Sequence, residues 1–548
     1  MLAMTVIPVR ARRLAVQWPP IRSFFPPVSD FSSAFLAASA LLIAALMLLT
    51  PAYLLVRTLG AGEAALQILL KPTTLTALWQ TILLAGSVTL ASVIISVPIA
   101  WLTVCTDLPG RRFWAVAAAL PLALPSYVTA YLLVTILGPR GLLQQTVLGP
   151  YWGVERLPSI YGFWGAFLAL TLMSYPYVLL SARVSLQRMD PALLEAGRSL
   201  GLSPWRAFWR ITLPQMRPAI IAGGLLVALY VVRDFGAVMM LRYNTFTRLI
   251  YIQYQSFFDR SLAAALALVL VVMTGVILYM ELRARGKAGY SRRSIGAARQ
   301  MAPVHLGKWR WPALLFVGSV VFVALILPGM GLIYWVVRGM ALGQSLSLVW
   351  SSAQNSLLIS LAAAALAVAA ALPVAILSVR RPSRMSHFVE RLTYAGFALP
   401  GIVIALALVF FGATYARPLY QTLPMLLVAY VILFIPQAVG STRSSLLQLP
   451  ASLEEAGRSL GHSGAAVFRR ITLPLLSPGV LAGGALVFLT CMKELPATLI
   501  LSPIGFRTLS TAVWGNINEA FFAQAAAPAL LLILLSSVPL ALMTLREK

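Results

Sequence analysis

Twelve apolar segments, each long enough to cross a membrane, alternate with polar loops along the chain. They are predicted near residues 34–57, 77–103, 113–137, 161–182, 218–241, 261–282, 311–337, 353–379, 389–414, 419–441, 478–501 and 521–544. Crossing the hydrocarbon core takes about 20 apolar residues at ~1.5 Å per residue. The pattern therefore predicts an all-α polytopic membrane protein with about 12 transmembrane helices, and the even number places both termini on one side.

The order of landmarks along the chain repeats, which divides it into two halves of six segments. Ala123-Leu-Pro125 in the third segment matches Ala398-Leu-Pro400 in the ninth, and a Gly-Gly pair opens the fifth and the eleventh. The most basic polar run lies between the halves. We expect an N-terminal segment at 1–33, a first transmembrane domain at 34–282, a basic linker at 283–310 and a second transmembrane domain at 311–548.

The charge balance is strongly basic, with 42 Lys and Arg against 15 Asp and Glu and a formal net charge of +27. The positions of these charges argue against a nucleic-acid partner. On the predicted map, 30 of the 42 basic residues fall in loops on the side of the termini. Because basic loops stay on the cytoplasmic side, both termini are predicted to be cytoplasmic. Contact with membrane lipid headgroups is a secondary expectation.

A polar loop follows the fourth segment of each half, and parts of its sequence are identical in the two copies. Glu195-Ala-Gly-Arg-Ser-Leu-Gly201 and Ile211-Thr-Leu-Pro214 recur 260 residues later, and 18 of 30 positions match over residues 195–224. Asp190 can cap a short helix, Gly201 suits the left-handed residue that ends it, and a second helix can start at Ser203. We expect helix, glycine bend, helix in both copies.

Two interpretations of this loop stay open on residue grounds alone. A short interfacial helix pair that merely joins two spans is common. Duplication in type and spacing favours a docking surface for a partner. Glycine at 197 and 201 would permit close backbone approach, and the carboxylate of Glu195 could pair with a basic group.

A second pair of repeat mates places charges inside the apolar segments, at Arg233-Asp234 and Lys493-Glu494. Such residues cost several kcal/mol each unless they are paired or hydrated. They either form ion pairs that fix packing or line the translocation path or its outer gate. Our hypothesis is that Asp234 and Glu494 face each other near the pseudo-twofold axis. Gly236 and Pro496 are expected to loosen the helix beside them.

The sequence lacks the residue patterns that ATP hydrolysis, metal binding and nucleophilic catalysis require. No Gly-x-x-x-x-Gly-Lys-Ser/Thr run is present, so the chain is not expected to hydrolyse ATP. The three histidines map to separate loops or segment ends, and no metal site or cofactor is expected in the chain. No nucleophile–base pair is visible, so we predict that it is not an enzyme.

The duplicated loop resembles the EAA loop of binding-protein-dependent ABC importer permeases, with Gly197 and Gly457 in place of an alanine. That resemblance covers nearly the whole chain, each half looking like one permease domain of the type I importer fold. It implies a bacterial inner-membrane subunit that docks two ATP-binding cassette subunits, expected as a homodimer using ATP and Mg, and an extracytoplasmic substrate-binding protein. The ATPase-coupling residues it implies are Glu195, Ala196, Gly197, Gly201, Ile211, Leu213, Pro214, Glu455, Ala456, Gly457, Gly461, Ile471, Leu473 and Pro474.

The cargo follows from a narrower resemblance. Residues 233–238 and 493–499 are similar to the corresponding spans of fused ferric-iron permeases. Permeases for thiamine, phosphonate, polyamine or an oxyanion have similar layouts and stay open. An outer loop at 138–159 that lengthens the first half could meet the binding protein.

Two other classes of protein fit the sequence less well. A major-facilitator secondary transporter also has twelve spans, and residues 107–112 superficially resemble its signature. The spacing is wrong, and the duplicated loops would be unexplained. A membrane enzyme would need paired carboxylates or clustered histidines near one interface, and the acidic residues outside the loops are scattered.

Overall fold

The computed structural model describes residues 31–187, 189–256, 260–288, 303–343, 347–396 and 399–546. Within these ranges the chain is built from helices, and its one extended pairing is a single bridge between Thr106 and Val304. The all-α prediction is confirmed. Residues 1–30 of the N-terminal segment and 289–302 of the linker fall outside the described residues, so the predicted domain bounds stay a prediction.

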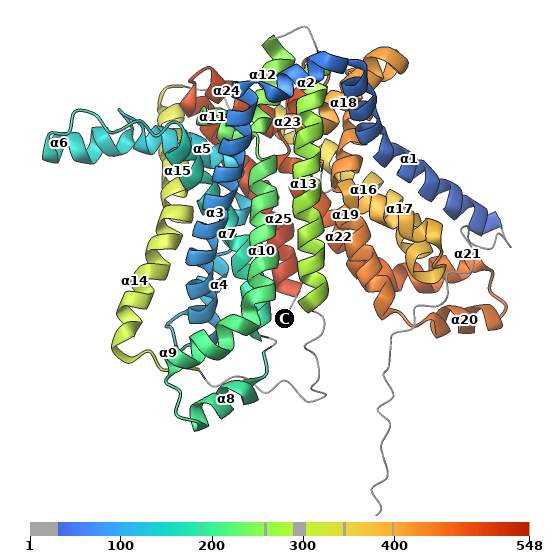
Figure 1. Cartoon of the computed structure of the whole chain (residues 1–548), viewed down its shortest axis with the longest axis horizontal. Coiled ribbons are helices and arrows are strands. Elements are labelled where there is room, and N and C mark those ends of the chain that lie inside the picture. The colour runs from blue at the N-terminus through green and yellow to red at the C-terminus, as the bar shows by residue number, and fades with distance from the viewer. Residues whose placement is uncertain are drawn as a thin grey trace, which may run out of the picture.

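The helices of the first half run in the order expected for six spans with a polar loop after the fourth (Figure 1). Their bounds are α1 Phe31–Gly60, α2 Gly62–Leu70, α3 Pro72–Cys105, α4 Arg111–Ala117, α5 Ser126–Leu137, α6 Gly149–Trp152, α7 Phe163–Gln187, α8 Pro191–Ser199, α9 Pro204–Ala207, α10 Leu213–Arg233, α11 Gly236–Met240, α12 Phe246–Ser256 and α13 Arg260–Ala288.

The second half repeats this order, with one long helix pair in the place of α1. Its helices are α14 Arg310–Val321, α15 Leu327–Ala341, α16 Ser347–Arg380, α17 Arg384–Ala395, α18 Gly401–Tyr415, α19 Leu423–Gln448, α20 Ala451–Ser459, α21 Gly464–Val467, α22 Leu473–Lys493, α23 Pro496–Leu501, α24 Leu509–Asn518 and α25 Phe522–Arg546.

Nine helices in the described residues are long and apolar enough to span a membrane, and α4 with α5 makes a tenth that is bent by 97°. The other two predicted segments, 389–414 and 521–544, fall on the shorter apolar helices Gly401–Tyr415 and Phe522–Ser537. Continuous helices over 113–137 and 389–414 were wrong. Pro125 and Pro400 have no amide hydrogen and sit at the N-terminal edges of α5 and α18, where each segment breaks.

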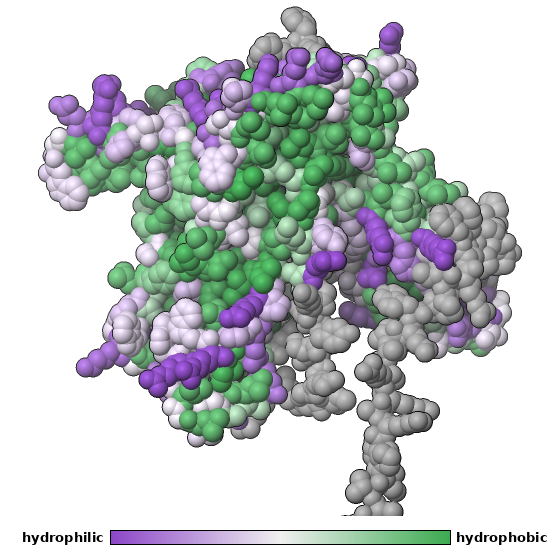
Figure 2. Space-filling model, in the orientation of Figure 1, coloured by the Kyte–Doolittle hydropathy of each residue, from purple (hydrophilic) through white to green (hydrophobic). Residues whose placement is uncertain are grey.

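On the face shown in Figure 2, apolar side chains form a belt across the middle of the molecule, and hydrophilic ones gather toward its two ends. Many of the exposed apolar residues lie on span helices, for example Leu90 and Ile94 on α3 and Leu358 and Leu361 on α16. On helices long enough to cross a membrane, such a surface is expected to face lipid. The belt shows directly why this chain belongs in a membrane.

The halves pack their inner helices in the same way. Gly223 on α10 comes so close to α7 that an added methyl would meet the Cα of Val178 at 2.9 Å, and Gly483 on α22 meets the Cα of Ala438 on α19 at 3.2 Å. Small residues let helix backbones approach in this manner, which supplies packing energy where lipid offers no hydrophobic driving force. The Gly-Gly repeat is therefore a pair of helix contacts.

The first helix of each half reaches across to the other half. α1 packs against α13 of its own half and against α16, α17 and α18 of the second. The pair α14–α15 does the converse, packing on α25 and on α4 and α5. The two halves are consequently interlocked rather than merely adjacent.

Candidate functional site

The first copy of the duplicated loop has the helix, bend, helix geometry expected for it. The Asp190 carboxylate accepts a hydrogen bond from the Ala192 amide at 3.0 Å, at the start of α8. Gly201 has φ +81°, a left-handed conformation that costs a residue with a side chain roughly 1–2 kcal/mol. Ser203 then accepts from the Arg206 amide at the start of α9. The predicted cap, bend and restart are confirmed.

The second copy repeats the bend and the restart but changes the cap. Gly461 has φ +84°, and Ser463 accepts from the Ala466 amide at 3.3 Å. α20 begins after Pro450, which gives no side-chain cap. In both copies a π-helical turn, at Phe208–Thr212 and Phe468–Thr472, joins the short second helix to the next span. Each loop is thus continuous with α10 or α22.

The glycine and the isoleucine of the motif pack against each other inside each loop. A methyl added at Gly197 would meet the Cδ1 of Ile211 at 2.5 Å, and one added at Gly457 would meet that of Ile471 at 2.7 Å. The obstructing atom is the flexible end of a side chain, so alanine could be fitted by a small rotation. The close approach expected at Gly197 therefore occurs within the loop, and it fixes the angle between the two short helices.

The surface that each loop presents consists of the residues next to this contact. Glu195 and Ala196 are exposed, as are Glu455 and Ala456. Leu200 and Leu460 are 85 % and 79 % exposed. Both loops project from the same end of the bundle, with α8 and α9 at one place and α20 and α21 at another (Figure 1). The arrangement presents two similar exposed surfaces at one end of the bundle.

The second loop is tied to the bundle by a polar anchor. The buried carboxylate of Glu454 accepts from Arg380 Nε and from Thr472 Oγ1, both at 3.2 Å. Arg380, the last residue of α16, also donates to the Leu449 carbonyl at 3.1 Å. In the first half Leu194 stands 260 residues before Glu454, and Cys105 ends α3 as Arg380 ends α16. This anchor was not predicted, although a carboxylate at 454 where the first half has Leu194, next to the duplicated run, was a usable signal.

The exposed surfaces of the two loops differ in their aromatic residues. On the first loop Trp205 stacks on Phe208, whose ring also meets Trp101 of α3, and Trp209 is 52 % exposed. On the second loop the positions of the two tryptophans are taken by Ala465 and Arg469. The first surface therefore carries two tryptophans that the second lacks, while each loop has three arginines.

The charged dipeptides lie opposite these loops, at the far ends of α10 and α22. Arg233 donates to the Leu399 carbonyl at 3.1 Å, and Lys493 donates to the Leu122 carbonyl at 3.2 Å. Each basic side chain thus extends from its own half to the other half. There it binds the third span, at the point where the proline interrupts that span. Backbone carbonyls at the two breaks have no partner within the helix, because the proline ends the helical hydrogen-bond pattern there.

The two carboxylates hold the short helices that follow. Asp234 accepts from the amides of Ala237 and Val238 at 2.9 and 3.4 Å, and Glu494 accepts from the Ala497 amide at 3.2 Å. Both α10 and α22 end at the cation, so the irregular segment expected beside the charges is confirmed. The structure brings each carboxylate to the opening of its own short helix. The hypothesis that Asp234 and Glu494 face each other stays a prediction.

Hydroxyl groups complete the same network in both halves. Thr247 donates to the Asp234 carbonyl at 2.6 Å, and Ser510 donates to that of Glu494 at 2.9 Å. The preceding amides, of Phe246 and Leu509, donate to a hydroxyl on α3 and on α16 respectively. A buried polar network that is satisfied twice in the same way has a strongly specified geometry. The dipeptides therefore sit at a rigid junction between the halves.

The end of the linker is fastened to the end of α3. The carboxylate of Asp107 accepts from the Leu306 amide and from Arg310, both at 2.9 Å, and lies 3.1 Å from His305 Nδ1. These partners, the amide foremost, lower the pKa of Asp107 from 3.8 to about 2. Asp107 opens the stretch that superficially resembles a major-facilitator signature, and its observed role is to hold the linker.

Two interlocked halves of membrane helices, each sending one helix–bend–helix loop from the same end, define a membrane permease built on an internal duplication. The chain belongs to the family of binding-protein-dependent transport system inner membrane components, whose model matches residues 109–285 and again 363–548. It is accordingly a multi-pass inner-membrane permease subunit of an ABC importer. Membership of this family excludes the major-facilitator interpretation.

Individual relatives extend this likeness along the chain. An Fe(3+)-transport system permease protein, FbpB 2 of Haemophilus influenzae, is 36% identical over 90% of this chain and 94% of its own. The ferric transport system permease FbpB of Actinobacillus pleuropneumoniae is 25% identical over 76% of this chain and 63% of its own. The molybdenum permease ModB of Escherichia coli is 36% identical, but over only 29% of this chain and 69% of its own.

Proposed function

We propose that the chain is the permease of an ATP-driven importer of ferric iron. The observation that carries this is the extent of the likeness to the Haemophilus influenzae Fe(3+) permease, which spans both halves and both charged dipeptides. The molybdenum and sulfate permeases match about a third of the chain. An oxyanion cargo therefore rests on the shared permease domain alone. The alternative cargoes thiamine, phosphonate and polyamine are supported only by a similar arrangement of spans in their permeases.

Recognition of the metal is assigned to a separate capture protein. Among the described residues no three His, Cys, Asp or Glu side chains gather into a group that could hold a metal ion. A permease without a tight metal site would let Fe(III) pass along the path and leave it rapidly. The protruding outer segment around α6, which carries exposed Tyr151 and Trp152, is the proposed contact for that protein (Figure 1).

The motor is proposed to be a pair of identical ATP-binding cassette subunits, which bind ATP and Mg and dock at residues 195–214 and 455–474. The exposed Glu195 and Glu455 are then the acidic contacts, and the leucines at 200 and 460 are the apolar ones. This assignment places the loops and both termini in the cytoplasm, as the distribution of basic residues predicts.

The geometry gives such a motor a mechanical route. Each loop is stiffened by its Gly–Ile contact and passes through a π turn into α10 or α22. These helices of 21 residues are about 30 Å long and end at Arg233 and Lys493, which bind the opposite half. Closing the ATPase dimer would move the loops and rock the halves about this junction, opening the path outward, and hydrolysis would reset it.

Uptake in proteoliposomes tests the proposal. The permease is reconstituted with its ATPase and with a ferric-binding or a thiamine-binding capture protein, and ATP-dependent uptake of Fe(III), thiamine and molybdate is compared. We expect uptake of Fe(III) alone. Uptake of another cargo without Fe(III) would overturn the cargo and leave the permease class intact. Retention of the ATPase after Glu195→Ala with Glu455→Ala would overturn the docking assignment.

A further inference from the structure

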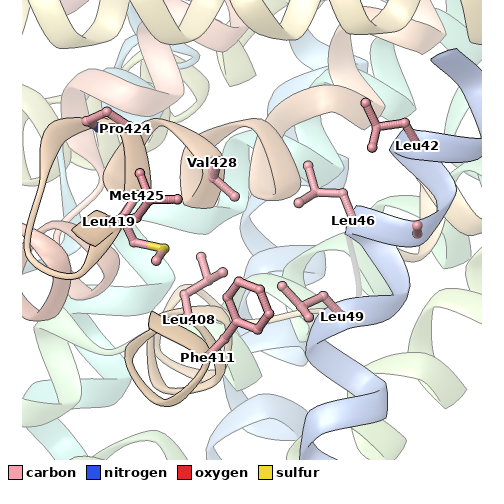
Figure 3. A pocket seen from close by; sticks show the side chains of 10 residues that line it. Leu42, Leu46, Leu49, Leu408, Phe411, Leu419, Pro424, Met425 and Val428 are labelled. Carbon is pink, nitrogen blue, oxygen red and sulfur yellow. The ribbon is translucent and has the colours of Figure 1, made fainter. Parts of the chain in front are cut away.

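An apolar cavity opens between α1 and the second half. It lies at the contact of α1 with α18 and α19, which we call the seam. Its volume is about 280 Å³. The side chains that enclose it come mainly from α1, α18 and the start of α19, and they include Leu42, Leu46, Leu49, Leu408, Phe411 and Met425 (Figure 3). No charged side chain is among its lining residues.

The cavity lies at a height where only lipid can reach it. Residues 42–49 occupy the middle of a candidate span, and Leu42 is 73 % exposed. Leu419, at the opposite side of the opening, is 46 % exposed. Water would find no hydrogen-bonding partner against such a lining. The occupant that matches the cavity chemically is an acyl chain.

A cation stands above the cavity on the same face of α1. Leu42, Leu46 and Leu49 are followed at helical spacing by Tyr53 and Arg57. The Arg57 guanidinium lies 4.3 Å from the centre of the Phe410 ring, and Tyr53 stacks on the same ring at 4.7 Å. Phe410 is next in sequence to the cavity residue Phe411. Aromatic contacts therefore hold Arg57 over the seam.

The charge of Arg57 has no counter-charge in the described part of the chain. No carboxylate there lies within ion-pair distance of it, and its Nε is buried without an acceptor. A second cation, exposed Arg417, precedes Leu419 by two residues. A guanidinium is the side chain best matched to a phosphate.

We propose that this seam is a binding site for one phospholipid, with an acyl chain in the cavity and the phosphate at Arg57. Arg57 stands eight residues beyond Leu49, or about 12 Å along the helix, which separates a headgroup from the chain region of the same lipid. Arg57 is near the end of α1 that leads into α2, opposite the duplicated loops (Figure 1), so the lipid belongs to the leaflet on that side.

The site has a structural consequence of its own. The bound lipid would fill the space between α1 and the helices α18 and α19, and so add to the contacts by which the first half holds the second. This role is independent of the cargo and of the ATPase docking assignment. It requires only the membrane location that the family establishes.

Native mass spectrometry of the purified full chain tests the site. The chain is stripped of lipid in detergent and titrated with phosphatidylglycerol. We expect one phospholipid to stay bound at activation energies that remove all others. Arg57→Met and, separately, Leu46→Phe, which fills the cavity, should each abolish this retained lipid, whereas Arg57→Lys should keep part of it.

Arg338→Met is the matched control. Arg338 lies in the last turn of α15, the counterpart of α1, and is held by Tyr334 and Trp335 of its own helix. This variant should keep the retained lipid. Melting curves identify any variant that does not fold, and Leu408→Phe replaces Leu46→Phe in that case. Equal retention in all folded variants, or a polypeptide that co-purifies in place of the lipid, would overturn the proposal.

Discussion

The guanidinium of Arg233 lies 3.1 Å from the carbonyl oxygen of Leu399, so a side chain of the first half is bound to the backbone of the second at a helix break. Lys493 returns the same bond to Leu122. The exchange joins the ends of the two helices that start at the duplicated loops. These bonds explain how two cations can lie within apolar segments. Each cation donates to a carbonyl of the other half that has no helical hydrogen-bond partner beside Pro125 or Pro400.

Removing either cation should loosen this junction. We expect Arg233→Met and Lys493→Met each to destabilise the chain by about 1.5–3 kcal/mol, the usual contribution of a hydrogen bond to a charged group. Arg233→Lys should restore part of the loss. Melting of the purified protein and ATP-dependent uptake measure the effect. Arg242→Met, which removes a cation from an outer turn, is the control, and equal melting of all variants would rule out the junction.

Neutralising the carboxylates separates a path role from a capping role. In Asp234→Asn and Glu494→Gln an amide oxygen can still accept from Ala237 or Ala497, so the short helices should keep their caps. If the charges serve the path, uptake falls by about tenfold, equivalent to ~1.4 kcal/mol, while the ATPase stays bound. Normal uptake in both variants would leave these residues with structure alone.

The Glu454 anchor should matter to the second loop only. Glu454→Ala leaves Arg380 without its carboxylate, and we expect a cost of about 1–3 kcal/mol, between that of an exposed and that of a fully buried pair. Transport per ATP hydrolysed should fall more than ATPase binding. The exchange Arg380→Glu with Glu454→Arg should recover part of the coupling.

A second ion pair in the same half provides the comparison for that experiment. Arg443 and Glu390 are 2.8 Å apart and join α19 to α17 away from the loop. Glu390→Ala should lower stability without changing the ratio of transport to hydrolysis. If Glu454→Ala and Glu390→Ala behave alike, the anchor has no special part in coupling.

The Asp107 contact predicts a dependence on pH at the linker. Because the pKa of Asp107 is lower in the folded chain than in an unfolded one, the contact stabilises the fold above pH ~4 and is lost as the pH falls toward about 2. Pepsin cleavage near Leu306 should rise over that interval. At neutral pH, Asp107→Ala should speed trypsin cleavage after Lys308 and Arg310, and Asp190→Ala, at another loop, should not.

Local features of the site could be predicted because each depends on neighbours in sequence. Asp190 caps the residue two positions on, and Gly201 ends a helix, so a short stretch of sequence suffices for both. The breaks at Pro125 and Pro400 were equally local. They were missed because hydrophobicity continues through them, and the recurring Ala-Leu-Pro was treated as a landmark rather than as a helix boundary.

Features made by contacts between distant segments could not be predicted in the same way. Nothing near Arg233 in the sequence indicates Leu399, which is 166 residues away. Arg380 and Glu454 are likewise joined only after two spans have packed. The partners of α1 were also hidden, since an apolar helix face is compatible with any apolar neighbour or with lipid.

The reaching first helix sets a condition on how the protein is made. α1 is complete at Gly60, but α16, the first of its partners in the second half, begins at Ser347. At ~5–20 residues per second, a ribosome needs roughly 15–60 seconds to synthesise the intervening chain. During that time α1 must wait in the bilayer with one face covered by lipid alone. Assembly of the permease therefore cannot finish half by half, and a chain truncated before α16 would leave its first helix packed on its own half alone.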